Sequence, residues 1–238
     1  MTRKLFLEKI KINKKTIKLF ISKKIFTPNL TTNLLVDACN KIINKNKKVL
    51  ELGCGSGIIS SYLYKKKIIT KIYCSDISEQ AIMCSVKNAK YLKAKHEIKI
   101  SNLFDNWKDE SFDYIINDVS AISESLNKMT NWYKYTTNQS GIDGTKFTIE
   151  ILKTFKNHLK KKGSLIFPII GLSNKNKILN FIKKNKIKNK LIASQEWPLP
   201  KEFYKYKKKL LDLNKKKIIQ IEEKLGFLTT KTDIYQCF

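Results

Sequence analysis

Three of the chain's eight glycines occupy alternate positions within one short stretch, VLELGCGSGII, as Gly53, Gly55 and Gly57. Glycine is costly inside strands and helices, but it can adopt positive φ and lets a ligand approach the backbone closely. An acid, Asp76, ends the next apolar run, nineteen residues after Gly57. A carboxylate in that position can accept hydrogen bonds from both hydroxyls of a ribose. The glycine turn and the acid together predict a site for a nucleoside-containing cofactor.

Two cofactor classes can be compared on the spacing of these glycines. A nicotinamide fingerprint, G-x-G-x-x-G, places a third glycine where the helix packs against the strand. Counted from Gly53 or from Gly55, that position holds Ile58 or Ser60, which disfavours a nicotinamide-dependent dehydrogenase. The pattern E-x-G-x-G-x-G, which begins at Glu51, instead resembles the first motif of class I S-adenosylmethionine-dependent methyltransferases.

Further motifs extend the resemblance from about residue 26 to residue 172, and it is closest to the release-factor glutamine methyltransferases and related small-domain methyltransferases. The segment D-I-S-E-Q-A-I at residues 76–82 and the pair Asn88-Ala89 match that family well. The segment Ser101-Asn102-Leu103-Phe104 replaces the family's S-D-L-F. Asn102 keeps an acceptor oxygen but loses the charge. A hydrogen bond to a neutral group contributes about 0.5–1.5 kcal/mol, against about 1.5–3 kcal/mol for a charged one.

The resemblance implies a set of cofactor-binding residues. Gly53, Gly55 and Gly57 are expected to admit the methionine and ribose parts of S-adenosylmethionine. Asp76, with Ile77 beside it, is expected to hold the ribose hydroxyls. The expected set is completed by Asn102 and Leu103 around the adenine, Glu51 near the amino group through water, and Asn117 at the end of the fourth strand.

The proposed acceptor side departs from the family. There the fourth strand ends in N-P-P-Y, which clamps a planar nitrogen, whereas this chain has Asn117-Asp118-Val119-Ser120. The family's acceptors, glutamine or a nucleobase nitrogen, are therefore not expected for this chain. Asn117 and Asp118 are the expected catalytic residues, with Asp118 orienting an amine or hydroxyl or removing its proton. The alternative for Asp118 is a structural turn cap.

Net charge leaves two acceptor classes open. A charge of +28 suggests a polyanion such as rRNA or tRNA. However, Arg3 is the only arginine, and the lysines are spread over nearly every segment. Proteins that recognise phosphate commonly use the bidentate guanidinium group. A protein or small-molecule acceptor is thus expected. The first alternative is methylation of RNA, and the second alternative is a non-catalytic module that only binds the cofactor.

These residues must be positioned by alternating strands and helices. From Lys47 the pattern strand–turn–helix repeats, which is typical of a parallel sheet covered on both faces. The fold class expected is α/β, with a Rossmann-like, mostly parallel, seven-stranded sheet behind a short N-terminal β-hairpin. The expected units are residues 1–30, a hairpin arm and loop, and residues 31–238, the methyltransferase domain, with 197–230 as a substrate-covering insertion. Thr31 or Thr32 is expected to cap the first helix.

Several site classes are disfavoured. Five scattered cysteines without a C-x-x-C pair, and two histidines, predict neither a zinc site nor a disulfide framework, so buried thiols and no metal are expected. No apolar run approaches the roughly 20 residues of a membrane span. A cytoplasmic protein without a membrane partner is expected. Trp197 and the pair Trp132-Tyr133 can be walls of the acceptor site or core residues, and the sequence leaves both open.

Overall fold

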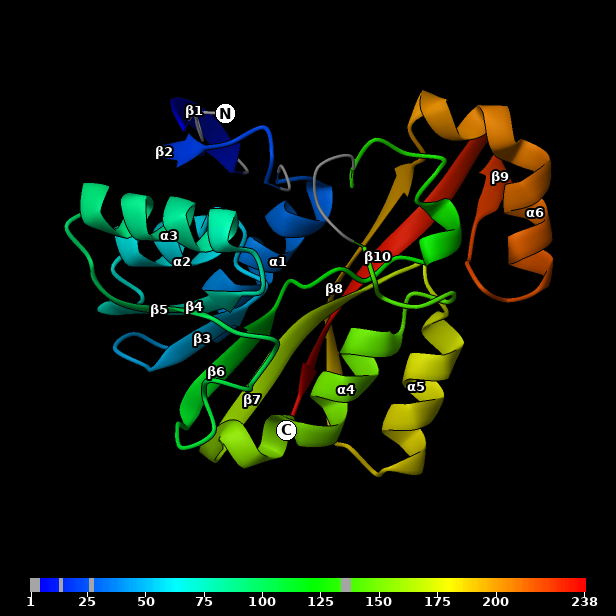
Figure 1. Cartoon of the computed structure of the whole chain (residues 1–238). Coiled ribbons are helices and arrows are strands. Elements are labelled where there is room, and N and C mark those ends of the chain that lie inside the picture. Colours follow the sequence, from blue (N-terminus) through cyan, green and yellow to red (C-terminus); the bar gives the residue numbers. More distant parts are fainter. Residues whose placement is uncertain (1–4, 13–14, 26–27, 134–137) are drawn as a thin grey trace.

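A central sheet carries the site, in a computed structural model that describes residues 5–12, 15–25, 28–133 and 138–238 (Figure 1). In order across the sheet, its strands are β5 (Lys95–Ile100), β4 (Lys71–Asp76), β3 (Val49–Leu52), β6 (Phe112–Asn117), β7 (Leu159–Ile170), β10 (Phe227–Cys237) and β8 (Asn189–Pro198). The pairings from β5 to β7 are parallel, whereas β10 is antiparallel to both neighbours. The expected mostly parallel α/β fold is confirmed.

An eighth strand was not expected from the sequence. β9 (Glu222–Lys224) pairs with the start of β10 and lies off the main order of the sheet. Its sequence, Glu-Glu-Lys, is exposed throughout and shows no apolar alternation. Sequence pattern detects strands through the apolar residues of their buried face, so this strand gave no signal.

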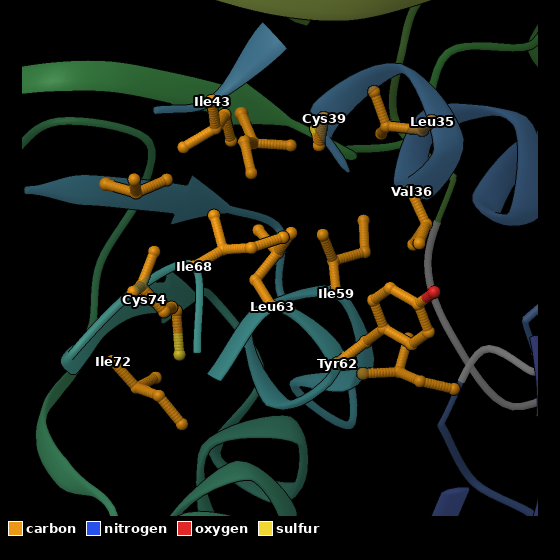
Figure 2. Packing of buried hydrophobic residues seen from close by; sticks show 14 of the residues in the cluster. Leu35, Val36, Cys39, Ile43, Ile59, Tyr62, Leu63, Ile68, Ile72 and Cys74 are labelled. Carbon is orange, nitrogen blue, oxygen red and sulfur yellow. The ribbon is translucent and has the colours of Figure 1, made fainter. Parts of the chain in front are cut away.

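Helices cover both faces of the sheet. The helices α1 (Leu30–Ile42), α2 (Ile58–Lys65) and α3 (Glu79–Tyr91) pack on one face, and α4 (Lys146–Thr154) and α5 (Lys175–Lys184) pack on the other. Neighbouring strand residues alternate between the two cores, as successive side chains in a strand must. Ile116 packs with the first core and Ile115 with the second. Figure 2 shows the first core, where side chains of α1, α2 and β4 meet.

A third apolar cluster lies beyond the carboxyl end of β6. The 3-10 helices η1 (Glu124–Leu126) and η3 (Lys201–Tyr206) and the helix α6 (Lys207–Lys215) contribute to it, whereas η2 (Phe155–His158) belongs to the second core. Phe203 and Leu210 pack with Leu126 and Met129 of the segment that follows β6. The late segment of the chain thus supports the loop that leaves the middle of the sheet.

The predicted N-terminal hairpin is present as β1 (Phe6–Ile12) and β2 (Lys15–Ile21). One fully buried amide, Asn88 of α3, fastens it to the rest of the chain. The Asn88 Oδ1 accepts a hydrogen bond from Phe20 N at 2.7 Å, and its Nδ2 donates to Phe20 O at 2.9 Å and to Ser56 O at 2.8 Å. The same side chain therefore ties the hairpin to α3 and to the glycine turn.

The cap of α1 differs from the expectation. Asn29, rather than Thr31 or Thr32, is the N-cap residue, and its side chain accepts from Thr31 N at 2.9 Å and Thr32 N at 3.3 Å. The prediction was wrong because Asn29 is an equally good cap and comes first along the chain. Both threonines are consequently in the first turn, where they line a cavity.

Candidate active site

A cavity of about 580 Å³ lies at the carboxyl edge of the parallel strands. The turns after β3, β4, β5 and β6 line it, together with the start of α1. The chain runs outward from β3 to β4 and β5 and then returns to place β6 on the other side of β3. Ligands of open α/β sheets bind at such a switch in strand order.

The glycine turn forms one wall, and its three glycines have different roles. All three adopt positive φ, at 74° for Gly53, 52° for Gly55 and 70° for Gly57. A Cβ atom on Gly53 would lie 2.8–2.9 Å from Val119, and one on Gly57 would lie 2.8 Å from Ser85 Oγ. A Cβ atom on Gly55 would meet only Ile25, at 3.6 Å. Two of the glycines therefore make room for the chain itself, and Gly55 is the position open to a ligand.

This difference predicts unequal effects of alanine substitutions. Gly53→Ala combines left-handed strain, about 1–2 kcal/mol, with overpacking against the Val119 backbone, about 1–3 kcal/mol. Gly55→Ala should carry only the strain. Urea unfolding of the two variants should therefore show a clearly larger loss of unfolding free energy for Gly53→Ala. Equal losses would contradict the assignment of Gly53 to internal packing.

Glu51 is buried beneath the turn and is absent from the residues that line the cavity. One carboxylate oxygen accepts from Ser60 N at 2.9 Å and also from Ser60 Oγ. Gly57, the N-cap residue of α2, has no side chain to accept these bonds, so Glu51 caps the helix from the neighbouring strand. Burial raises the pKa of Glu51 to about 7, although the Ser60 hydrogen bonds oppose the shift.

The raised pKa of Glu51 predicts a pH-dependent stability. The folded chain holds this proton more tightly than the unfolded chain, whose value is 4.5, so ionisation favours unfolding. The free energy of unfolding should fall as pH rises from about 4.5 to about 7, by up to about 3 kcal/mol at ~1.4 kcal/mol per pKa unit. Glu51→Gln keeps the bond from Ser60 N and should remove the part of this dependence that comes from Glu51, whereas the raised pKa values of Asp76 and Asp118 leave a remainder. Urea midpoints at pH 5 and pH 8 compare the two proteins, and equal pH dependence would refute the role of Glu51.

Asp76 joins the turns after β3 and β4. Its Oδ2 accepts from Gly55 N at 2.9 Å, and its Oδ1 accepts from Ser78 N at 2.9 Å. Burial raises the pKa of this carboxyl, although its backbone hydrogen bonds oppose the shift. Asp76 lines the cavity beside Ile77, which is 65% exposed, and Asn102 and Leu103 approach from the turn after β5. Most of the predicted cofactor residues are thus brought together; we call this part the donor end of the cavity.

The turn after β6 forms the opposite end, which we call the acceptor end. Asn117 is buried, its Oδ1 accepts from Val119 N at 3.0 Å, and it is not among the lining residues. Asp118 lines the cavity, and its N donates to Leu52 O at 3.0 Å. Burial raises the pKa of Asp118 well above its usual range, and the nearby Glu51 carboxylate adds to the shift.

Aromatic side chains complete the acceptor end. Trp132, Tyr133 and Trp197 all line the cavity. The Trp132 and Trp197 rings lie 6.2 Å apart at 44°, and the Trp197 Nε1 donates to Thr232 Oγ1 at 2.9 Å. Tyr133 hydrogen-bonds to Ser120, and burial raises the pKa of Tyr133 to about 12. All three also pack against the third apolar cluster, so they combine the two possibilities that the sequence left open, cavity wall and core residue.

Other lining residues escaped the sequence analysis. Thr31, Phe147, Pro168 and Ile170 reach the cavity from α1, α4 and β7, far from the motifs in sequence. Only Thr31 had a signal in the sequence, because it lies between Pro28 and Thr32, which match the family's segment before the first helix. The remaining contacts depend on how α4 and β7 pack, which residue spacing does not reveal.

Among the described residues, no three or more His, Cys, Asp or Glu side chains are grouped so as to hold a metal ion. Within the same part of the chain, no helix is both long and apolar enough to cross a bilayer. All five cysteines are buried free thiols, as expected.

A match to a known family covers the donor end of the site. Residues 22–118 match the family described as Methyltransferase small domain. The match begins just after the hairpin and ends at Asp118, so it contains the glycine turn, Asp76, Asn102 and the end of β6. The aromatic residues of the acceptor end lie outside it.

Relatives of known sequence or structure agree with this match. A release factor glutamine methyltransferase from Dictyoglomus turgidum is 30% identical over 179 residues, which cover 70% of this chain and 62% of that protein. This chain spans about three fifths of the length of such relatives: 62% of the Dictyoglomus protein and 61% of the release factor glutamine methyltransferase of Clostridium acetobutylicum. The fold matches the tRNA m1G37 methyltransferase of M. jannaschii, with a TM-score of 0.58, 15% identity and coverage of 98% and 55%. It also matches SMU.776, a candidate methyltransferase complexed with SAH, with a TM-score of 0.59, 15% identity and coverage of 99% and 57%.

Proposed function

We propose that this chain, whose residues 22–118 match the family described as Methyltransferase small domain, transfers a methyl group from S-adenosylmethionine to an acceptor on a protein or a small molecule. The observation that carries the proposal is the cavity of about 580 Å³, which joins a nucleoside-type donor end to an aromatic, carboxylate-bearing acceptor end. Alignment of two reactants in one closed space contributes up to about 7–11 kcal/mol to such a transfer.

The donor end fits an adenosyl group. The Asp76 carboxylate accepts backbone hydrogen bonds from Gly55, Ser78 and Ile77, and because a carboxylate offers about four acceptor sites, it can still accept a hydrogen bond from the ribose. Asn102 and Leu103 are placed to border the adenine, and Gly55 leaves the space that a side chain would fill. The comparison with SMU.776, which was complexed with SAH, supports the same cofactor. Glu51 and Asn117 would act by shaping the two turns.

The chain's own residues carry the rest of the mechanism. When bound, S-adenosylmethionine supplies an already activated sulfonium methyl group. Asp118 lies at the strand end between the donor and acceptor ends, where its carboxylate can orient the acceptor and take a proton from it. Trp132, Tyr133 and Trp197 exclude water from this end. We further propose that residues 197–230, which carry Trp197 and pack over the loop after β6, act as a cover while residues 1–30 form the hairpin arm and loop.

A protein acceptor is favoured by the release factor methyltransferase relatives. RNA remains the second candidate because of the hairpin surface. Lys9 and Lys18 are exposed and directly opposed across β1 and β2, although like charges in that position destabilise a hairpin. An RNA acceptor predicts an affinity that falls steeply as salt is raised, since phosphate contacts release counterions.

The proposed activity can be tested with methyl-labelled donor. Purified protein is incubated with labelled S-adenosylmethionine and cell extract, and the nucleic acid, protein and metabolite fractions are counted separately. Label in protein or metabolite supports the proposal, whereas label in nucleic acid would show that the acceptor is RNA, the second candidate. Donor binding without label in any fraction identifies a non-catalytic binding module and refutes the proposal.

A further inference from the structure

The acceptor end is built from aromatic faces and one carboxylate. Trp132 and Trp197 form adjoining walls, and the Phe203 ring supports Trp132 from behind at 5.6 Å. Tyr133 and Asp118 line the same space. Aromatic faces attract cations through the ring quadrupole, and they do so more strongly when the cation is removed from water.

The distribution of charge around the cavity favours a cationic occupant. The chain has 48 Lys and Arg against 20 Asp and Glu. Among the described residues lining the cavity, however, Lys24 is the one basic residue, whereas Asp76 and Asp118 are acidic. Lys24 lies near the donor end: it precedes Ile25, which also lines the cavity and whose Cγ2 faces Gly55. The described acceptor end therefore holds a carboxylate and no cation, in a chain where lysine is abundant.

We infer that the acceptor is an aliphatic amine, such as a lysine side chain or an amino terminus, which enters as its ammonium ion between the aromatic walls and Asp118. This inference deepens the proposed function and rests on it. A carboxylate acceptor would be repelled by Asp118. A neutral planar nitrogen could stack on the aromatic faces but carries no charge to pair with Asp118, and the family's N-P-P-Y clamp for it is replaced here by Asn117-Asp118-Val119-Ser120.

The transfer balances with the groups in place. The ionised Asp118 carboxylate accepts one proton from the ammonium, which frees the nitrogen lone pair. That lone pair attacks the sulfonium methyl, so that a C–N bond forms as the C–S bond breaks and S-adenosylhomocysteine leaves neutral. The product is a methylated ammonium ion, and Asp118 releases its proton to solvent. The cationic donor and the cationic acceptor both favour the ionised form of Asp118, against the effect of its burial.

The positions of Tyr133 and Ser120 fit this step. The Tyr133 hydroxyl is hydrogen-bonded to Ser120, and Asp118 is close enough to influence its ionisation. Burial keeps the Tyr133 phenol protonated by raising its pKa to about 12. The ring is therefore an uncharged wall for the ammonium, and Tyr133 acts as a positioning residue beside Asp118.

A binding experiment on the full chain tests the inference without needing turnover. Three matched compounds, the Nα-acetyl methylamides of lysine, glutamine and norleucine, are titrated while tryptophan fluorescence is recorded, with and without S-adenosylhomocysteine. The lysine compound should bind at least tenfold more tightly than both others. Asp118→Asn should remove most of this preference, Trp197→Leu should weaken it, and Trp197→Phe should largely restore it.

The outcomes separate this inference from the proposed function. Equal binding of the three compounds, or preference for glutamine, overturns the amine acceptor even if S-adenosylhomocysteine binds. Failure of S-adenosylhomocysteine to bind overturns the proposed function, while the comparison of the three compounds still decides the character of the pocket. In the labelling experiment, label that survives acid hydrolysis as a methylated amine supports the inference. Label released as methylamine from an amide, or as methanol from an ester, overturns it.

Discussion

Replacement of Asp76 by alanine should lower the affinity for S-adenosylmethionine at least tenfold. In the proposed function this carboxylate accepts a hydrogen bond from the ribose, and a hydrogen bond to a charged acceptor contributes about 1.5–3 kcal/mol. Loss of about 1.4 kcal/mol already corresponds to a tenfold change. The substitution also leaves Gly55 N and Ser78 N without their acceptor, so the glycine turn loses its support. Calorimetric titration of the variant measures the effect.

Two control variants accompany this titration. Asp109→Ala removes one exposed carboxylate in the loop after β5, outside the cavity lining, and should leave the affinity unchanged. Asn102→Ala removes a neutral acceptor at the donor end and should weaken binding by less than Asp76→Ala. Unchanged affinity in Asp76→Ala would remove this residue from the cofactor site.

Asp118→Asn should lower the turnover number about a hundredfold or more while leaving donor affinity within a few-fold. Proton transfer by a positioned base contributes about 10²–10⁴-fold, and an amide of the same shape cannot accept the proton. Asp118 belongs to the turn after β6, whereas the expected ribose and adenine contacts come from the turns after β4 and β5, so ground-state binding should survive. Turnover number and donor affinity, measured on one confirmed acceptor, separate these effects.

The pH profile distinguishes a base from a structural cap at position 118. The wild-type rate should fall as pH is lowered through the pKa of Asp118, because the carboxylate must be ionised to accept a proton. Burial raises that pKa, so the loss should occur at higher pH than for an ordinary aspartate. The acid limb should be absent from Asp118→Asn. Full activity of this variant at every pH would show that Asp118 is not the base.

The donor end could be predicted because local sequence determines it. Gly53, Gly55 and Asp76 are within a single strand–turn–helix–strand unit, and the carboxyl ends of neighbouring parallel strands necessarily meet. The function of each glycine could not be predicted, however. All three have positive φ, but only the folded chain shows that Val119 and Ser85 occupy the space beside Gly53 and Gly57.

The acceptor end depends on contacts between distant segments. Trp132 and Trp197 are 65 positions apart in the sequence, and their meeting requires β10 to pair with β7 and β8 to pair with β10. Glu51 shows a related limit. The motif implied a cofactor contact, whereas burial and the bonds from Ser60 make it the cap of α2. Local pattern thus identified the residue without identifying its partner.

Calorimetric titration of the full chain with S-adenosylhomocysteine tests the central claim most directly, that the cavity between the glycine turn and Asp76 is a cofactor site. The account predicts saturable binding of one molecule per chain, at least tenfold weaker in Asp76→Ala and unchanged in Asp109→Ala. Absence of binding to the folded wild-type chain, or equal affinity in wild type and Asp76→Ala, would contradict it.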